Sequence, residues 1–539
     1  MPCINFIGVG EIDVSEETTV LEAAWQLGIV IESPCNGAGV CGKCNVQLSG
    51  DSQSKEETYV LACETHVLED MSVFPPEKEK NYTLKILSGG KSFDIELNPN
   101  VKKQHLSEKS VTEVRAGEEI LCTEPGNTAE KNLGLSLDIG TTTLVLSLID
   151  LNDGREIDSV SAMNPQAVYA QDVLSRIKFA SSEEGLETMR SALITEVNKM
   201  LEILEQRSNK SKENIYEAIF SGNTCMLHLA AGVQPAALGK YPYTSAIEGI
   251  STLKAVDMGL NISNAGVVYL PPCISAYVGA DITSGILASS LFELNGVTLF
   301  VDIGTNGEMV IGANGKLCAA STAAGPAFEG MNIAKGMRAG NGAVEEFEIA
   351  DGEIRIKVIG NTKAVGICGS GLIDIVGELV FHNVISKSGK FSDAAQLPPF
   401  LAERLIEQDG KKVFQVEGDV VLTQKDIRQV QLAKGAIRAG IEYLLRAKNT
   451  PPEQVDRVLI AGSFGYHLRA KSLININLMP KEFEGKIEFV GNTSSSGGIA
   501  FLLGKQYRAK MEKKIKEIEV LELANMPDFE KLFVKTLNF

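Results

Sequence analysis

Long apolar segments are missing from this sequence of 539 residues. No stretch of 18 or more uncharged apolar residues occurs, so we expect no helix that crosses a bilayer. Basic residues are missing from the first part of the sequence, where Lys43 is the first Lys or Arg. The sequence therefore lacks the basic start that is typical of a secretory signal. We therefore expect a cytoplasmic protein.

Positive charge is also scarce: 51 Lys and Arg stand against 69 Asp and Glu, a net charge of −18. Nucleic acids and anionic membranes bind mainly through basic side chains, so neither is an expected partner. The 10 cysteines are too dilute for a disulfide framework. With 44% hydrophobic and 22% charged residues, the composition is that of a globular protein of several domains.

Four of the cysteines are nevertheless crowded into one segment. Cys35, Cys41 and Cys44 have the spacing C-x5-C-x2-C, and Cys63 follows after 18 further residues. Intervening glycines let a loop turn tightly and point N–H groups at sulfur. The pattern is close to that of plant-type 2Fe-2S centres. Zinc is the alternative metal, but structural zinc sites draw on paired C-x2-C knuckles, and only Cys41 and Cys44 form one.

The residues around these cysteines favour the same kind of domain. Residues 4–7 and 11–14 predict a β-hairpin, and Thr19-Val20-Leu21-Glu22 is a capping box that opens a short helix. Together with the cysteine motif, they resemble ferredoxins of the β-grasp fold over residues 1–80.

A second motif occurs twice. The tetrapeptide D-I-G-T stands between two apolar segments at Asp138 and returns at Asp302, 164 positions later. Such a repeat indicates two similar lobes. A Gly-Thr turn offers backbone N–H and hydroxyl donors to phosphate, while an Asp at a strand end can hold Mg²⁺ through water or orient the attacking water. One copy could be an ordinary acidic turn; two copies in matching settings predict a nucleotide held in a cleft between the lobes.

A third motif, Ala461-Gly462-Ser463-Phe464-Gly465, ends an apolar segment, and its small residues would let a purine approach the backbone. The same letters could form the nucleophile elbow of an α/β-hydrolase. That enzyme class needs a later acid and then a His, and His467 is the only His after Ser463. The hydrolase interpretation is therefore disfavoured.

The three motifs, in this order, resemble the phosphate and adenosine motifs of the ATPase superfamily that contains actin, sugar kinases and heat-shock chaperones. The resemblance implies that residues 279–281 and 496–500 open two helices connecting the lobes, and that Asp138 and Asp302 are catalytic. The nucleotide-binding residues implied are Gly140, Thr141, Thr142, Thr143, Gly304, Thr305, Asn306, Gly325, Glu329, Gly369, Ser370, Gly462, Ser463 and Phe464.

Over nearly its whole length the chain resembles the reductive activators of corrinoid proteins, through V-D-I-G-T, G-P-A-F-E-G, G-I-C-G-S-G-L-I-D and G-S-F-G. The resemblance implies an α/β multidomain protein. By this resemblance we expect a β-grasp 2Fe-2S ferredoxin domain over residues 1–80 and a linker with a little strand structure over 81–131. We expect an actin-like (ribonuclease H-like) ATPase of two duplicated lobes over 132–539, with the second lobe from about residue 297.

The same resemblance implies the function. A cluster held by Cys35, Cys41, Cys44 and Cys63 would pass one electron to a methyltransferase-associated corrinoid protein, reducing cob(II)alamin to cob(I)alamin. ATP with Mg²⁺ would supply the driving force, since about 59 mV of uphill one-electron transfer is a factor of ten in equilibrium. An unidentified low-potential donor and a homodimer are also implied.

Two other functions stay open at this point. One is a redox sensor or chaperone-like protein, in which the cluster reports redox state and nucleotide sets partner affinity. The other is an ATP-dependent activator of a radical dehydratase. Such activators usually share a 4Fe-4S cluster between two subunits, so a fused 2Fe-2S domain speaks against that choice.

The sequence also predicts one long amphipathic helix, from Gln424 to Leu445. We expect its Lys425, Arg428 and Lys434 to form a solvated face.

Overall fold

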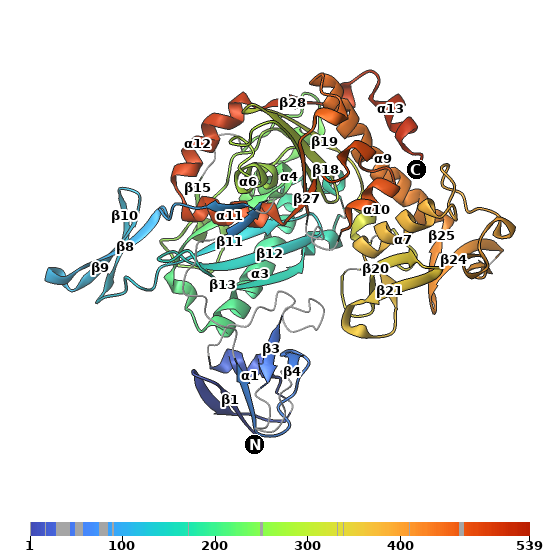
Figure 1. Cartoon of the computed structure of the whole chain (residues 1–539). Coiled ribbons are helices and arrows are strands. Elements are labelled where there is room, and N and C mark those ends of the chain that lie inside the picture. Colours follow the sequence, from blue (N-terminus) through green and yellow to red (C-terminus); the bar gives the residue numbers. More distant parts are fainter. Residues whose placement is uncertain are drawn as a thin grey trace. The chain divides into compact units, whose positions relative to one another are not determined.

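The computed structural model of the chain describes residues 2–16, 18–27, 44–48, 58–74, 85–88, 91–170, 172–247, 252–330, 332–337, 339–408, 410–462 and 468–539 (Figure 1). Cys35, Cys41, Ser463 and Phe464, all predicted site residues, lie outside the described residues. The chain divides into two compact units. Unit 1 comprises Met1–Ile86, Ser92–Ala288 and Ser494–Ile515, and unit 2 comprises Leu87–Lys91, Ser289–Thr493 and Lys516–Phe539.

The N-terminal part of unit 1 is a five-stranded mixed sheet with one helix. The strand order is β2-β1-β5-β3-β4. The bounds are β1 (Cys3–Phe6), β2 (Gly10–Asp13), β3 (Asn45–Leu48), β4 (Thr58–Leu61), β5 (Met71–Phe74) and α1 (Val20–Gln26). The predicted capping box opens α1, because Thr19 N donates to Glu22 Oε2 at 2.8 Å and Glu22 N donates to Thr19 Oγ1 at 3.2 Å. The expected hairpin and β-grasp arrangement are confirmed.

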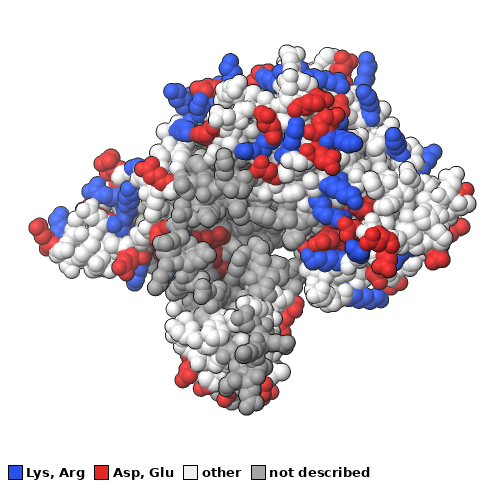
Figure 2. Space-filling model, viewed as in Figure 1, with Lys and Arg blue, Asp and Glu red and all other residues white. Residues whose placement is uncertain are grey.

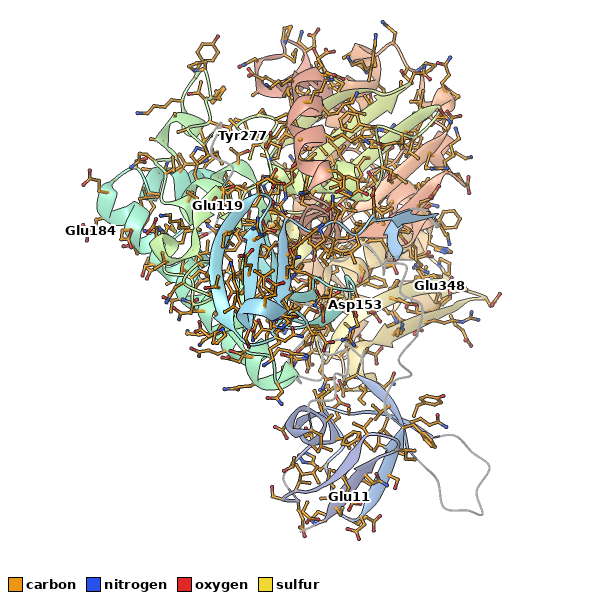
Figure 3. The ribbon with its side chains drawn as sticks, turned by 90° about the vertical axis from the view of Figure 1, so that its left-hand side faces the viewer. Glu11, Glu119, Asp153, Glu184, Tyr277 and Glu348 are labelled. Atoms are coloured by element: carbon orange, nitrogen blue, oxygen red, sulfur yellow. The ribbon has the colours of Figure 1, made fainter. Side chains whose placement is uncertain are left out.

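The interval predicted as a linker contains more regular structure than expected. β6 (Lys85–Ser88) pairs with β7 (Lys91–Asp94), and a separate antiparallel sheet has the order β10-β9-β8. Its bounds are β8 (Val101–Leu106), β9 (Val111–Ala116) and β10 (Glu119–Pro125), with Glu119 labelled in Figure 3. Lys103 Nζ lies 2.9 Å from Glu124 Oε2 and ties β8 to β10. These residues therefore form a folded sheet.

The large sheet of unit 1 has the order β13-β12-β11-β14-β16-β15. Its strands are β11 (Leu133–Ile139), β12 (Thr143–Asp150), β13 (Glu156–Met163), β14 (Ile215–Gly222), β15 (Thr252–Lys254) and β16 (Val267–Tyr269). β11 to β13 form an antiparallel meander, and β14 lies parallel to β11. The helices are α2 (Val173–Phe179), α3 (Glu183–Ser208), α4 (Thr224–Ala231), α5 (Ala255–Met258), α6 (Ala280–Ala288), α11 (Thr493–Leu503) and α12 (Gln506–Lys514).

Unit 2 repeats this plan. Its large sheet has the order β27-β26-β17-β18-β19-β28, so β19-β18-β17-β26-β27 matches β13-β12-β11-β14-β16. The duplication indicated by D-I-G-T is therefore present as two sheets of the same topology. The strands are β17 (Val297–Ile303), β18 (Gly307–Ala313), β19 (Lys316–Thr322), β26 (Arg457–Ala461), β27 (Ile487–Gly491) and β28 (Glu519–Leu521).

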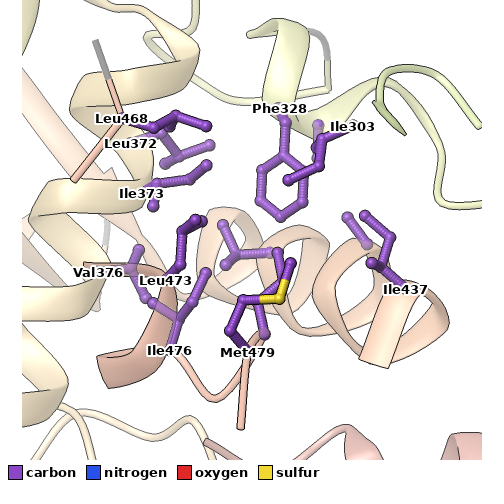
Figure 4. Packing of buried hydrophobic residues seen from close by; sticks show 14 of the residues in the cluster. Ile303, Phe328, Leu372, Ile373, Val376, Ile437, Leu468, Leu473, Ile476 and Met479 are labelled. Carbon is purple, nitrogen blue, oxygen red and sulfur yellow. The ribbon is translucent and has the colours of Figure 1, made fainter. Parts of the chain in front are cut away.

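In the described part of unit 2, two three-stranded sheets and five α-helices accompany the large sheet. The small sheets are β20 (Ala343–Ala350), β21 (Glu353–Val358), β22 (Gly366–Ile367) and β23 (Leu405–Gln408), β24 (Lys411–Glu417), β25 (Val420–Thr423). The helices are α7 (Gly369–Phe381), α8 (Pro399–Ala402), α9 (Gln424–Ala447), α10 (Ala470–Asn475) and α13 (Phe529–Thr536). Apolar side chains of α7, α9 and α10 pack with Ile303 of β17, with Phe328 after β19 and with Met479 after α10 (Figure 4).

The prediction that Lys434 lies on a solvated face of α9 is wrong. The long helix is present, but α13 packs against it and Lys434 is fully buried. Its Nζ donates to the carbonyl oxygen of Asn538 and lies 5.1 Å from the ring centre of Phe539. Burial lowers the pKa of Lys434 to about 7. Charge patterning within one helix gave no sign that residues about a hundred positions later would cover it.

The surface shown in Figure 2 has acidic and basic side chains interspersed. Among the described residues, no helix is both long and apolar enough to span a membrane.

Candidate functional site

Cys44 and Cys63 bring two of the four predicted cluster ligands together. Cys44 directly precedes β3 and Cys63 follows β4, and these strands pair with Asn45 opposite Leu61. The pairing continues one step past the end of the two strands, where Ala62 N donates a hydrogen bond of 2.8 Å to Cys44 O. The two Sγ atoms lie 3.2 Å apart, with Cys44 buried and Cys63 half-buried.

This sulfur pair fits a metal centre. A disulfide would need a separation of about 2.05 Å. Two thiolates on one tetrahedral metal ion, with metal–sulfur bonds of about 2.3 Å, lie about 3.8 Å apart. The observed 3.2 Å lies between these two distances, so the two sulfur atoms are not bonded to each other and are close enough to share a metal ion; their role as ligands stays a prediction. Their distance alone does not distinguish iron from zinc, and Cys35 and Cys41 fall outside the described part of the chain.

Asp138 stands near the end of β11, beside the first predicted phosphate turn. Its Oδ1 accepts a hydrogen bond of 2.7 Å from Ser494 Oγ, in the first turn of α11. Gly140 N then donates to Thr143 O at 2.9 Å and closes the turn. A Cβ atom on Gly140 would lie 2.6 Å from that oxygen, so a side chain there would collide with the backbone. Asp138 and residues 140–143 therefore form one compact corner of unit 1.

Asp281, in the first turn of α6, lies close to Asp138 but is not among the site residues predicted from the sequence. Burial raises the pKa of its carboxyl to about 7, and the nearby negative charge of Asp138 adds to the rise. Two carboxylates in mutual repulsion form a favourable environment for a divalent cation with oxygen ligands. In the sequence, Asp281 is part of the tripeptide G-A-D, which predicts only the start of a helix.

The residue before α6 explains how this corner closes. A Cβ atom on Gly279 would lie 2.5 Å from Asn223 Cα, so only glycine allows α6 and the start of α4 to approach this closely. Asn223 caps α4 through its Oδ1, and its Nδ2 donates to Thr141 Oγ1 at 3.3 Å. Asn223 therefore links α4 to the phosphate turn, and it too is absent from the predicted site residues.

The two predicted connecting helices are present, with one difference. α6 begins at Ala280 as expected, whereas α11 begins at Thr493, before the predicted Ser496. A Cβ atom on Gly497 would lie 2.1 Å from Ser284 O. The small residues thus mark where α11 crosses α6 closely, rather than where α11 starts.

The second predicted turn follows Asp302 at the end of β17. Gly304 N donates to Asn306 O at 3.0 Å, and Gly325 N donates to Thr305 O at 2.8 Å. Thr305 Oγ1 donates to a carboxylate oxygen of Glu329. The structure therefore brings the predicted residues of this turn together with the G-P-A-F-E-G segment.

Gly462 lies beside the same turn, at the end of β26. Asp302 pairs in register with Ala461, the residue before it. Gly462 has a φ of +133°. A Cβ atom there would lie 2.6 Å from Ile303 O. Both the backbone conformation and the close approach require glycine.

Gly369 and Ser370 lie in the first turn of α7. A Cβ atom on Gly369 would lie 1.8 Å from Phe328 O, which places this turn against the segment carrying Glu329. Ser370 is 3% exposed, and its Oγ donates to Glu345 O at 3.1 Å. The Ser370 hydroxyl therefore serves an internal bond, and the nucleotide-binding role of Gly369 and Ser370 stays a prediction.

Three family models match the chain. The model described as "2Fe-2S iron-sulfur cluster binding domain" matches residues 6–68. The model described as "RACo middle region" matches residues 133–293, and "C-terminal domain of RACo the ASKHA domain" matches residues 296–539.

Two relatives and one solved structure are similar to the chain. The chain is 30% identical over 587 aligned residues to the corrinoid activation enzyme RamQ of Eubacterium limosum, covering 98% of this chain and 97% of that protein. A Co(II) methylated amine-specific corrinoid protein reductase of Methanosarcina barkeri is 24% identical, over 67% of this chain and 68% of its own. A solved structure of a reductive activator for corrinoid, iron-sulfur protein matches with a TM-score of 0.76 and 30% identity, over 100% of this chain and 98% of that one. The chain therefore belongs to the family of reductive activators of corrinoid proteins.

Proposed function

We propose that this protein uses ATP to reduce the cobalt of a corrinoid protein by one electron, from Co(II) to Co(I). The observation that carries the proposal is the Cys44–Cys63 sulfur pair at 3.2 Å, on the same chain as a duplicated Asp-Ile-Gly-Thr motif and within a whole-length match to a corrinoid activation enzyme. The sulfur pair suits an electron carrier, and the turns suit an ATPase.

Cys35, Cys41, Cys44 and Cys63 would hold the cluster. A 2Fe-2S cluster bound by four thiolates supplies a one-electron reductant, with a potential near −400 mV in plant-type ferredoxins. Cobalt acceptors below that potential stay mostly oxidised unless another reaction drives the transfer. ATP hydrolysis is such a reaction. The free energy that it must supply is about 1.4 kcal/mol for each 59 mV by which one electron moves uphill.

The nucleotide residues would act by position and charge. The turns after Asp138 and Asp302 would donate N–H and hydroxyl groups to phosphate oxygens of ATP, and the two carboxylates would hold Mg²⁺ through water or orient the attacking water. Ser494 belongs to the same set through its hydrogen bond to Asp138, and Asp281 through its charge repulsion with Asp138. The remaining predicted nucleotide residues, the electron donor and the homodimer stay predictions.

An anaerobic assay with matched variants tests the proposal. Pre-reduced protein, MgATP and a methyltransferase-associated corrinoid protein in the Co(II) state are mixed, and the cobalt absorbance is followed. Asp138→Ala should abolish Co(I) formation and leave the cluster spectrum unchanged. Asp153→Ala is the control, since Asp153 is an exposed residue of the β12–β13 turn with a carboxylate 52% exposed (Figure 3). Full activity of Asp138→Ala would overturn the nucleotide assignment.

A further inference from the structure

The first Gly-Thr-Thr turn is held by two buried polar residues, Asn164 and Arg176. Asn164 is 1% exposed and caps the short helix η2 (Pro165–Val168), while Arg176 is 0% exposed and lies in α2. Full burial of a guanidinium group costs several kcal/mol unless its surroundings compensate. The buried charge of Arg176, next to a predicted phosphate turn, must therefore have a compensating interaction or a function.

Together the two residues bind all three carbonyl oxygens of the turn. Asn164 Nδ2 donates to Gly140 O at 2.8 Å, and Asn164 N donates to Thr142 O at 2.9 Å. Arg176 Nη2 donates to Thr141 O at 2.6 Å. In a planar trans peptide the C=O and the following N–H point to opposite sides. Holding the carbonyls on one side therefore turns the following N–H groups to the other, as in an anion-binding nest.

Arg176 also donates to two neighbouring oxygen atoms. Its Nε donates to Ala170 O at 3.0 Å and its Nη1 donates to Gln166 Oε1 at 3.2 Å. The planar fork of Arg allows these bonds and the bond to Thr141 at once, which the single ammonium of Lys could not reproduce. In a poorly screened interior, its positive charge also attracts an anion on the far side of the turn.

We infer that Asn164 and Arg176 are positioning residues for nucleotide phosphate: they orient the peptide groups of residues 140–142, and Arg176 adds a buried positive charge behind them. The inference rests on the proposed function, because it takes this turn as phosphate-binding. A role confined to folding would stabilise the chain without changing the affinity of the folded protein for nucleotide.

The experiment compares ATP affinity with intrinsic stability in the full-length protein. MgATP is titrated calorimetrically into the wild type, Arg176→Gln, Arg176→Lys, Asn164→Asp and Arg190→Gln. Thermal unfolding without nucleotide is measured alongside. Arg190 is the matched control, since its Nη2 also donates to a backbone carbonyl, Asp257 O, at 2.6 Å, but away from the turn.

Arg176→Gln should weaken ATP binding about tenfold, the loss expected for one charge-assisted hydrogen bond. Arg176→Lys should fall between it and the wild type, and Arg190→Gln should stay within about twofold of the wild type. Asn164→Asp keeps the acceptor that caps η2 but loses the donor to Gly140 O, and it should also weaken binding. It serves as the test if Arg176→Gln does not fold.

Unchanged ATP affinity in folded Arg176→Gln or Asn164→Asp, with only a lower melting temperature, would overturn the inference and leave the proposed function standing. Failure of the wild type to bind ATP would overturn the proposed function, and the inference with it.

Discussion

The hydroxyl of Ser494 donates to Asp138 Oδ1 at 2.7 Å, although 356 positions separate the two residues. Asp138 lies near the end of β11, an inner strand of the unit 1 sheet, and Ser494 lies in the first turn of α11, the helix that crosses α6 at Gly497. The bond therefore orients the carboxylate that precedes the first Gly-Thr-Thr turn. It also joins segments of the ATPase part that are far apart in the sequence.

Ser494→Ala should lower the rate of ATP hydrolysis by roughly three- to tenfold, the effect of one lost hydrogen bond of about 1 kcal/mol. Cluster content should not change. Thr188→Ala is the control, because it removes a hydroxyl that donates to Glu184 O within α3. A wild-type hydrolysis rate in Ser494→Ala would show that Asp138 is oriented without this bond.

Cys63→Ala should abolish stable binding of iron, because Cys63 Sγ is one half of the sulfur pair at 3.2 Å. ATP hydrolysis should continue. Iron and acid-labile sulfide are measured chemically in anaerobically purified protein. Cys318→Ala is the comparison, since Cys318 is a buried residue of β19 with no expected ligand role. Normal iron content in Cys63→Ala, or equal loss in both variants, would contradict the ligand assignment.

Gly462→Ala should weaken ATP binding by at least about tenfold, because the new Cβ atom would lie 2.6 Å from Ile303 O and displace the backbone beside Asp302. Gly485→Ala separates this clash from backbone strain. Gly485 also has a positive φ, +76°, but no atom lies within 4 Å of a Cβ built on it. Gly485→Ala should lose some stability and keep the ATP affinity of the wild type. Equal ATP affinities for the two variants would remove Gly462 from the site.

Lys434 predicts a stability change with pH. Its folded-state pKa of about 7 is below the ordinary value of 10.5, so the unfolded chain binds more protons between these pH values. The free energy of unfolding should therefore rise with pH through this interval. Lys434→Met removes the titrating group. Between pH 7 and pH 9, the wild type should gain about 2 kcal/mol more than Lys434→Met in urea unfolding. Parallel pH profiles would show that Lys434 titrates normally.

Features carried by local sequence were predictable. The capping box at Thr19, the helix starting at Gln424 and the repeated D-I-G-T motif each depend on residues close together in the chain, and each appears in the structure. The topology shared by the two large sheets explains why one tetrapeptide was a sufficient marker of the duplication.

Features that depend on distant contacts were not predictable. The burial of Lys434 depends on α13, and the carbonyl contacts of Arg176 depend on how α2 packs behind the turn. Asp281 was visible in the sequence only as part of a helix start, because its closeness to Asp138 arises from folding. A little strand structure was expected in residues 81–131, but the extent of the β8 to β10 sheet was hidden by its polar composition, since exposed strands lack a continuous apolar pattern.

The most direct measurement of the central claim is a single-turnover reaction without oxygen, in which pre-reduced protein and a Co(II) corrinoid protein are mixed with ATP and Mg²⁺, with ADP and Mg²⁺, or with Mg²⁺ alone. The account predicts that the Co(I) absorbance rises with ATP only, by no more than one cobalt reduced for each cluster oxidised. An equal rise without ATP would contradict it, and so would hydrolysis of ATP with no change in cobalt.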